Sequence, residues 1–286
     1  MKLRILTALL LIPPVLYLVI RAPWWAFLAA LLVVVERTAY EYFELSRSGG
    51  MESLRGFGYT GCAALCVAQV ADLRSPAPSD SSGIVVLALA VLLVIAALTF
   101  GLIITADVRQ YLRAACSSLF AIFYIGLLLS TLVPLRFSPA VAEILGTAIP
   151  QRYLLMLLFG VVWIGDACAY FVGRGIGRHR LFPRISPKKT LEGSLGGLVG
   201  SMLLAWALGR WWRTSDIGVV LLLAGLAAIA GQVGDLAESA LKRSADLKDS
   251  GSLLPGHGGL LDRIDSLIFA APVVWLALVV LHFWKA

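Results

Sequence analysis

The sequence predicts an all-α, polytopic integral membrane protein with about nine transmembrane helices. Of the 286 residues, 59% are hydrophobic and only 14% are charged, whereas soluble domains carry about 25% charged residues. The apolar residues also form repeated runs of the length that a helix needs to cross a bilayer, about 20 residues. The formal charge of +7 is then typical of basic cytoplasmic loops, and we do not expect a nucleic-acid partner.

The apolar segments predict the order of the spans. They lie at residues 5–20, 24–35, 57–71, 84–105, 116–135, 153–173, 193–213, 217–234 and 266–284. The first resembles a signal peptide, but no A-x-A-like cleavage site follows it, so we expect it to be retained. We expect an N-terminal region, 1–150, with about five spans and a C-terminal catalytic region, 151–286, with about four. Internal repeats typical of many transporters are not found.

The distribution of basic residues predicts the orientation in the membrane. With nine spans and a cytoplasmic N-terminus, most of the 24 Lys and Arg residues fall on the cytoplasmic side, as the positive-inside rule requires. The polar loops 174–192 and 235–265 then both face the cytoplasm, and the C-terminus lies outside. The basic sequence pI of about 9.4 and the retained first span favour a bacterial inner membrane.

The first polar loop is strongly basic. From Arg174 to Lys189 there are six Lys or Arg residues and no acid, and each would attract phosphate at a membrane surface by about 1 kcal/mol. Topology alone also explains such a loop. The stronger candidates are Ser186, Lys188, Lys189 and Thr190, because they precede a glycine-containing helix whose N-terminus suits an anion. Asp166 lies in the preceding apolar run, where either a functional role or a hydrogen bond between helices would explain it.

The second polar loop combines acids, cations and glycines. Asp235, Glu238 and Lys242 share one face if the preceding helix continues. A turn rich in glycine around His257 can bring the backbone of Gly258 and Gly259 against a ligand. Carboxylates beside cations predict a Mg²⁺ site that binds substrate phosphates, as phosphoryl or nucleotidyl transfer requires. The acids are Asp235, Asp249, Asp262 and Asp265, and the cations are Lys242, Arg243 and Lys248. An ordinary solvated charged loop is the alternative.

Residues 239–265 resemble the signature of the phosphatidate cytidylyltransferases, also called CDP-diacylglycerol synthases. The matching positions are Ser239, Lys242, Arg243, Lys248, Asp249, Pro255, His257, Gly258, Gly259, Asp262, Arg263 and Asp265. The stretch 165–197 also resembles this family. Residues 1–150 resemble it only in being hydrophobic, so they carry little information about function.

The resemblance implies transfer of a cytidylyl group from CTP to phosphatidate within a lipid bilayer, with Mg²⁺ and room for a second cation. It implies Asp235 and Asp262 as the first metal ligands, followed by Asp265 and Asp249. Phosphates would be bound by Lys188, Lys189, Lys242, Arg243, Lys248 and Arg263. Lys248 and His257 are the further catalytic candidates, although His257 could equally cap local backbone. Substrate contacts are also expected from Ser186, Thr190, Gly258 and Gly259, and Asp166 and Glu238 are additional candidates.

Three other classes of membrane protein share some of these features. The D-G-x-x-A-R motif of the CDP-alcohol phosphotransferases is not found in the sequence. A CTP-dependent lipid kinase would share a substrate but lack the complete signature. A transporter of anions would more often place its charges at the membrane midplane. Glycine and alanine on the helix faces would permit a homodimer, but they equally favour packing of helices within one chain.

Overall fold

The computed structural model describes residues 13–70, 81–105, 107–145, 149–251, 253 and 258–285. Helices dominate these residues, which confirms the all-α class, and a two-stranded antiparallel sheet is added to them. The chain forms two compact units. Unit 1 is built mainly from Ala22–Pro134 and Leu241–Arg263, and unit 2 from Val15–Arg21, Leu135–Ala240 and Ile264–Ala286. Each unit combines separated stretches of chain, and the expected division into two consecutive regions after residue 150 stays a prediction.

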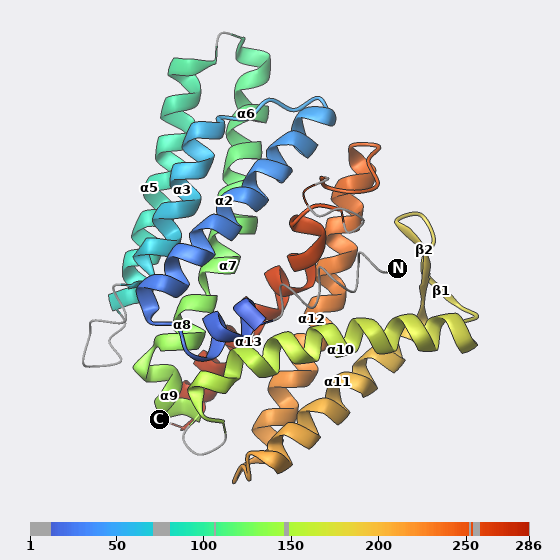
Figure 1. Cartoon of the computed structure of the whole chain (residues 1–286). Coiled ribbons are helices and arrows are strands. Elements are labelled where there is room, and N and C mark those ends of the chain that lie inside the picture. Colours follow the sequence, from blue (N-terminus) through green and yellow to red (C-terminus); the bar gives the residue numbers. More distant parts are fainter. Residues whose placement is uncertain are drawn as a thin grey trace. The chain divides into compact units, whose positions relative to one another are not determined.

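Unit 1 is a bundle of helices around α3. Its elements are α2 (Trp24–Ser48), α3 (Arg55–Ala68), α5 (Ser81–Ile104), α6 (Val108–Ala121), the π-helical turn η1 (Ile122–Leu127) and α7 (Leu128–Ser130), and α8 (Leu132–Phe137) begins in it. Helix α3 packs against α2, α5 and η1 (Figure 1). A Cβ atom at Gly126 would lie only 2.7 Å from the Cα of Cys62. The absence of a side chain there therefore permits the close approach of η1 to α3.

Buried hydroxyl groups fix the C-terminal end of α2 within unit 1. The Oγ atoms of Ser46 and Ser53 each lie 2.7 Å from the Oγ of Ser117 on α6. The backbone N–H of Leu54 donates to Ser118 Oγ at 2.7 Å. Because buried polar groups are costly unless they are hydrogen-bonded, these contacts hold α2 against α6 in one arrangement.

Unit 2 contains the helices of the C-terminal half. They are α9 (Pro139–Leu145), α10 (Gln151–Ile176), α11 (Leu191–Trp211), α12 (Ile217–Ser244) and α13 (Leu261–Lys285), although the last turn of α12 and the first residues of α13 belong to unit 1. Helices α10 and α11 run side by side along their length (Figure 1). A Cβ at Gly165 would lie 2.6 Å from Ser201 Oγ, and that hydroxyl donates to Val161 O at 2.8 Å. Small residues therefore bring these two helices into close contact.

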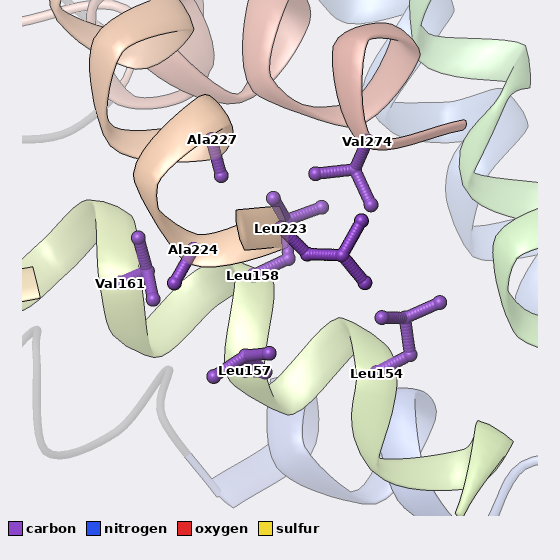
Figure 2. Close-up of a pocket in the computed structure, with 8 residues that line it drawn as sticks. All are labelled: Leu154, Leu157, Leu158, Val161, Leu223, Ala224, Ala227 and Val274. Carbon is purple, nitrogen blue, oxygen red and sulfur yellow. The ribbon is translucent and has the colours of Figure 1, made fainter. Parts of the chain in front are cut away.

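The apolar core of unit 2 lies between α10, α12 and α13. A pocket there is lined by eight aliphatic side chains, among them Leu158, Leu223 and Val274 (Figure 2). A lining without polar groups cannot orient a charged nucleotide. The pocket therefore belongs to the packing of the core.

Six helices among the described residues are long and apolar enough to cross a membrane. They are Gly83–Ile104, Val108–Phe137, Gln151–Ile176, Leu191–Trp211, Ile217–Ser244 and Leu261–His282. On α5 the side chains of Leu87 and Ile103 are 64% and 74% exposed, which is typical of a helix that faces lipid. These findings confirm a polytopic membrane protein, and the expected count of nine spans is not confirmed.

The remaining expected spans differ for separate reasons. Residues 5–12 of the first expected span lie outside the described residues. The second falls within α2, whose C-terminal half carries Glu36, Arg37 and Glu41. The third, 57–71, overlaps α3, which has only 14 residues and ends at Ala68. The charges of α2 and the length of α3 make both poor membrane-crossing helices.

Candidate functional site

The two polar loops are shorter in the structure than the sequence suggested. Helix α12 continues to Ser244, so Asp235, Glu238 and Lys242 do lie on one helix, as predicted for a continued helix. The first loop forms a hairpin of strands β1 (Arg180–Phe182) and β2 (Ser186–Thr190), which the sequence reading did not predict. Alternating apolar and polar residues are absent from these short basic strands, so a periodic signal could not identify them.

Asp262 organises the part of the signature that belongs to unit 1. Its Oδ1 accepts a hydrogen bond from Lys242 Nζ at 2.6 Å. Its Oδ2 accepts from the backbone N–H groups of Ser250 at 3.0 Å and Gly259 at 2.8 Å, and from Ser250 Oγ at 3.0 Å. The side chains of Asp262 and Lys242 are only 7% and 13% exposed. These donors balance the charge of the Asp262 carboxylate, and the carboxylate fixes the backbone around the start of α13.

The glycines of the signature make room for carboxylates. Gly258 has a φ of +79°, a conformation that other residues rarely adopt. A Cβ at Gly258 would lie 2.6 Å from Asp262 Oδ2, and one at Gly259 would lie 2.3 Å from Glu41 Oε2. Both glycines were predicted to bind substrate through their backbone. The N–H of Gly259 instead donates to Asp262 in this structure, and a substrate contact stays a prediction.

Glu41, which the sequence did not single out, contacts residues on both sides of the glycine-rich turn. It lies on α2, and its side chain is 1% exposed. Its Oε2 accepts from Ser250 Oγ at 3.1 Å and from the N–H of Leu261 at 2.8 Å, and its Oε1 lies 3.2 Å from Nη2 of Arg37. In the sequence, Glu41 could have been noticed as a charged residue that follows an apolar run and stands four positions after Arg37, a spacing that allows an ion pair on a helix. The same residues are also typical of the end of a membrane span, so the signal was ambiguous.

A second cluster of charged residues lies in unit 2. Lys189 of β2 forms an ion pair with Asp235 of α12. Asp235, Asp166 and Lys189 are all close enough to Asp265 to act on it electrostatically. We call these four residues the unit 2 acidic cluster. Within it, the ion pair of Lys189 with Asp235 joins β2 to the C-terminal half of α12.

The unit 2 acidic cluster contains two of the four carboxylates that were predicted to bind metal, Asp235 and Asp265. The other two, Asp249 and Asp262, belong to unit 1. Among the residues that the structure describes, no three Asp, Glu, His or Cys side chains are grouped as a metal site of three such ligands would require. Asp166, a further candidate, is exposed on α10, and Glu238 is 1% exposed on α12.

Side chains of the same chain make hydrogen bonds at the N-terminus of α11. Thr190 is the N-cap residue, and its Oγ1 accepts from the N–H of Gly193 at 3.1 Å. Glu192 in the first turn accepts from the N–H groups of Arg178 and His179, and its Oε1 lies 2.6 Å from His179 Nδ1. The hydroxyl of Thr190 thus caps the helix, and its predicted contact with substrate stays a prediction.

The other predicted site residues lie at or near the surface. Asp249, a predicted metal ligand, is exposed, and Ser186, a predicted substrate contact, is half-buried at the start of β2. The predicted phosphate-binding cations Lys188, Arg243, Lys248 and Arg263 are exposed. Exposure leaves these cations accessible to a charged ligand from solution. His257, a predicted catalytic residue, lies outside the described residues together with Pro255.

Comparison with known proteins agrees with the signature. A stretch of 119 residues is 48% identical to a phosphatidate cytidylyltransferase of Bacillus subtilis and covers 41% of this chain and 44% of that protein. A stretch of 185 residues is 40% identical to the Synechocystis phosphatidate cytidylyltransferase and covers 58% of this chain and 62% of that protein. For the Staphylococcus haemolyticus protein of the same name, the identity is 43% over 128 residues. The chain thus aligns with about half the length of these curated relatives.

The relatives each match only part of the chain, but the family model extends over almost all of it. The model described as the cytidylyltransferase family matches residues 2–281. The match includes Glu41, the hairpin, the unit 2 acidic cluster and the signature segment. The chain therefore belongs to the cytidylyltransferase family.

Proposed function

We propose that the chain is a phosphatidate cytidylyltransferase, which converts CTP and phosphatidate into CDP-diacylglycerol and pyrophosphate. The observation that carries this proposal is the family match over residues 2–281, which includes both polar clusters. The name of the relatives at 40% and 48% identity supports the same substrates. Membrane-crossing helices beside clusters of charged residues are what an enzyme needs when one substrate is a lipid and the other a soluble nucleotide.

The proposed reaction requires charge neutralisation more than covalent chemistry by the protein. A phosphate oxygen of phosphatidate forms a bond to the α-phosphorus of CTP. The bond from that phosphorus to the oxygen that bridges to the β-phosphorus breaks, and pyrophosphate leaves with the electron pair. Positioned cations and hydrogen-bond donors stabilise such charge in the transition state. Within unit 1, the exposed Lys248 and Arg263 are suited to this role because an exposed cation is accessible to the phosphates of a nucleotide from solution.

The unit 2 acidic cluster fits a magnesium ion. Asp235 and Asp265 offer the hard oxygen ligands that Mg²⁺ prefers, and such sites commonly use one or two carboxylates with phosphates of the substrate. The ion pair of Lys189 with Asp235 would orient that carboxylate. When bound, Mg²⁺ would neutralise charge on the triphosphate and on the leaving pyrophosphate. The predicted metal ligation by Asp262 and Asp249, and a second cation, stay predictions.

We also propose that the protein lies in a bacterial inner membrane, with the N-terminus and both polar loops in the cytoplasm and the C-terminus outside. The contact of Lys189 with Asp235 supports a common side, because it brings the hairpin to the C-terminal part of α12. CTP would then reach the site from the cytoplasm, and phosphatidate from the bilayer. A homodimer stays a prediction.

The test is formation of product in detergent micelles. Purified protein is mixed with phosphatidate, Mg²⁺ and CTP that carries its label either in the cytidine or in the γ-phosphate. The expected result is a cytidine-labelled lipid and release of labelled pyrophosphate, both abolished by EDTA. Transfer of the γ-label to lipid would instead show a lipid kinase. Failure of folded protein to consume CTP would overturn the proposal.

A further inference from the structure

The buried carboxylate of Glu41 joins the two ends of the segment 251–260. Ser250 precedes this segment and Leu261 follows it, and both donate to the same oxygen, Oε2 of Glu41. The other oxygen, Oε1, faces Arg37 of the same helix. One oxygen of the carboxylate therefore pairs with Arg37 of α2, and the other accepts hydrogen bonds from Ser250 and Leu261. A buried carboxylate is retained at such a place only with partners of this kind.

The glycines of the segment show that the fit around Glu41 is close. A Cβ at Gly251 would lie 3.1 Å from Glu41 Oε1. A Cβ at Gly259 would lie 2.3 Å from Glu41 Oε2 and 2.2 Å from Ser250 Oγ. A side chain at either position would push the backbone there away from the carboxylate. Gly251 and Gly259 thus allow the backbone at these two positions to lie against Glu41.

Ser250 connects Glu41 to the charged residues of the signature. Its Oγ lies 3.1 Å from Glu41 Oε2 and 3.0 Å from Asp262 Oδ2. A hydroxyl group has one proton, so it can donate fully to only one of these two carboxylates. Asp262 in turn binds Lys242 Nζ. Ser250 therefore lies in a chain of direct contacts from Glu41 to Asp262 and Lys242.

We propose that Glu41 is a positioning residue for cytidylyl transfer: its carboxylate holds Ser250 and Leu261, and through them the signature residues Asp262 and Lys242, in the arrangement that the reaction uses. This inference rests on the proposed function. It gives the N-terminal half of the chain, through α2, a direct part in shaping the signature segment. Glu41 acts through these residues and is not itself placed against substrate.

The decisive variant is Glu41→Gln, which keeps the size of the side chain and removes its charge. The carboxylate of Glu41 has two oxygens that accept hydrogen bonds, but the amide of Gln has one oxygen and one NH₂ group. The NH₂ group would therefore face other donors, either those of Arg37 or those of Ser250 and Leu261. The matched control is Glu44→Gln. Glu44 lies on the same helix, is 40% exposed and pairs with Arg55 at 2.5 Å, and its known contacts do not include the signature segment.

Hydrogen exchange in the absence of substrates tests the positioning directly. In detergent, the amides of residues 258–262 should exchange about 10- to 100-fold faster in Glu41→Gln than in wild type, because Leu261 loses a charge-assisted hydrogen bond. In Glu44→Gln they should exchange as in wild type. The turnover number per folded molecule should fall by about 10- to 100-fold in Glu41→Gln only, because misplacement of catalytic groups has effects of this size.

Ser250→Ala provides a second test if Glu41→Gln does not fold. It removes the shared hydroxyl but keeps the ion pair of Glu41 with Arg37, and it should change exchange and turnover in the same direction by a smaller factor. If the wild type makes CDP-diacylglycerol but neither variant changes exchange and turnover together, the positioning role is overturned. A different result is also possible: the variants exchange faster, but the wild-type protein makes no CDP-diacylglycerol. The contact would then stand, but the proposed function would be wrong, and the catalytic part of this inference with it.

Discussion

Asp262 and Asp235 were expected to have the same role, but their surroundings differ. Asp262, in unit 1, accepts hydrogen bonds from Lys242, from two backbone N–H groups and from a hydroxyl. Asp235, in unit 2, pairs with Lys189 and acts electrostatically on Asp265. One aspartate is surrounded by donors, and the other pairs with a partly exposed lysine.

This difference teaches that a charged residue in a signature can serve the fold, the chemistry or both. The donors around Asp262 balance its charge and fix the backbone next to it, so its loss should disturb structure. Asp235 and its partner Lys189 are both partly exposed, and such an ion pair contributes little to stability, so loss of Asp235 should disturb the structure less. The comparison therefore predicts different consequences for the same substitution at these two positions.

The largest expected effect on turnover is that of Asp235→Asn. Loss of a proposed magnesium ligand should lower the turnover number by at least about 10²- to 10³-fold, while the unfolding temperature in detergent should change little because the ion pair with Lys189 is partly exposed. The two measurements are product formation and thermal unfolding. Asp216→Asn, at the other end of α12, keeps a side-chain oxygen that can accept from Val219 N and should leave both unchanged. Near-normal turnover in Asp235→Asn would remove it from the proposed metal site.

Asp262→Asn should lower stability as well as turnover. Breaking one partner of a buried ion pair costs about 3–5 kcal/mol, and Lys242 would be left facing an amide group. Unfolding in detergent should therefore show a clear loss of stability, and Asp246→Asn, an exposed position in the same loop, should show little. Unchanged stability in Asp262→Asn would remove the distinction drawn between the two aspartates.

Gly259→Ala tests whether the donors around Asp262 depend on close packing of the backbone. The added methyl group would overlap Glu41 Oε2 and Ser250 Oγ, and forced repacking of this kind costs about 1–3 kcal/mol. Gly175→Ala is the control, because a Cβ at Gly175 has no atom within 4 Å. Equal stability of the two variants would contradict the fit that the structure shows around Glu41.

The smallest expected effect is that of Thr190→Ala, next to the unit 2 acidic cluster. Loss of an N-cap hydroxyl costs about 1 kcal/mol, and the start of α11 should loosen beside Lys189. Thr190→Ser keeps the hydroxyl and should retain stability. If Thr190→Ser and Thr190→Ala both lose turnover equally at unchanged stability, the methyl group of Thr190 serves the substrate, and capping is not its main role.

Local patterns in the sequence were sufficient for much of this description. The apolar runs predicted a helical membrane protein, because the bilayer requires long apolar helices whatever their neighbours are. The spacing of Asp235, Glu238 and Lys242 predicted their common helix, since helical periodicity is a local property. The signature predicted the family. The number of spans was less secure, because α2 and α3 are helical in the structure but are charged or short.

Contacts between residues far apart in the chain could not be predicted from local sequence patterns. The sequence alone determined the membrane class, the basic loops and the signature, because composition and short spacing carry that information. Only the tertiary structure decided that Lys189 pairs with Asp235, that Asp262 is surrounded by donors, and that Glu41 joins the signature from 209 and 220 residues away. The physical reason is that a hydrogen bond depends on distance in space, and packing of whole helices sets that distance for residues so far apart in the chain.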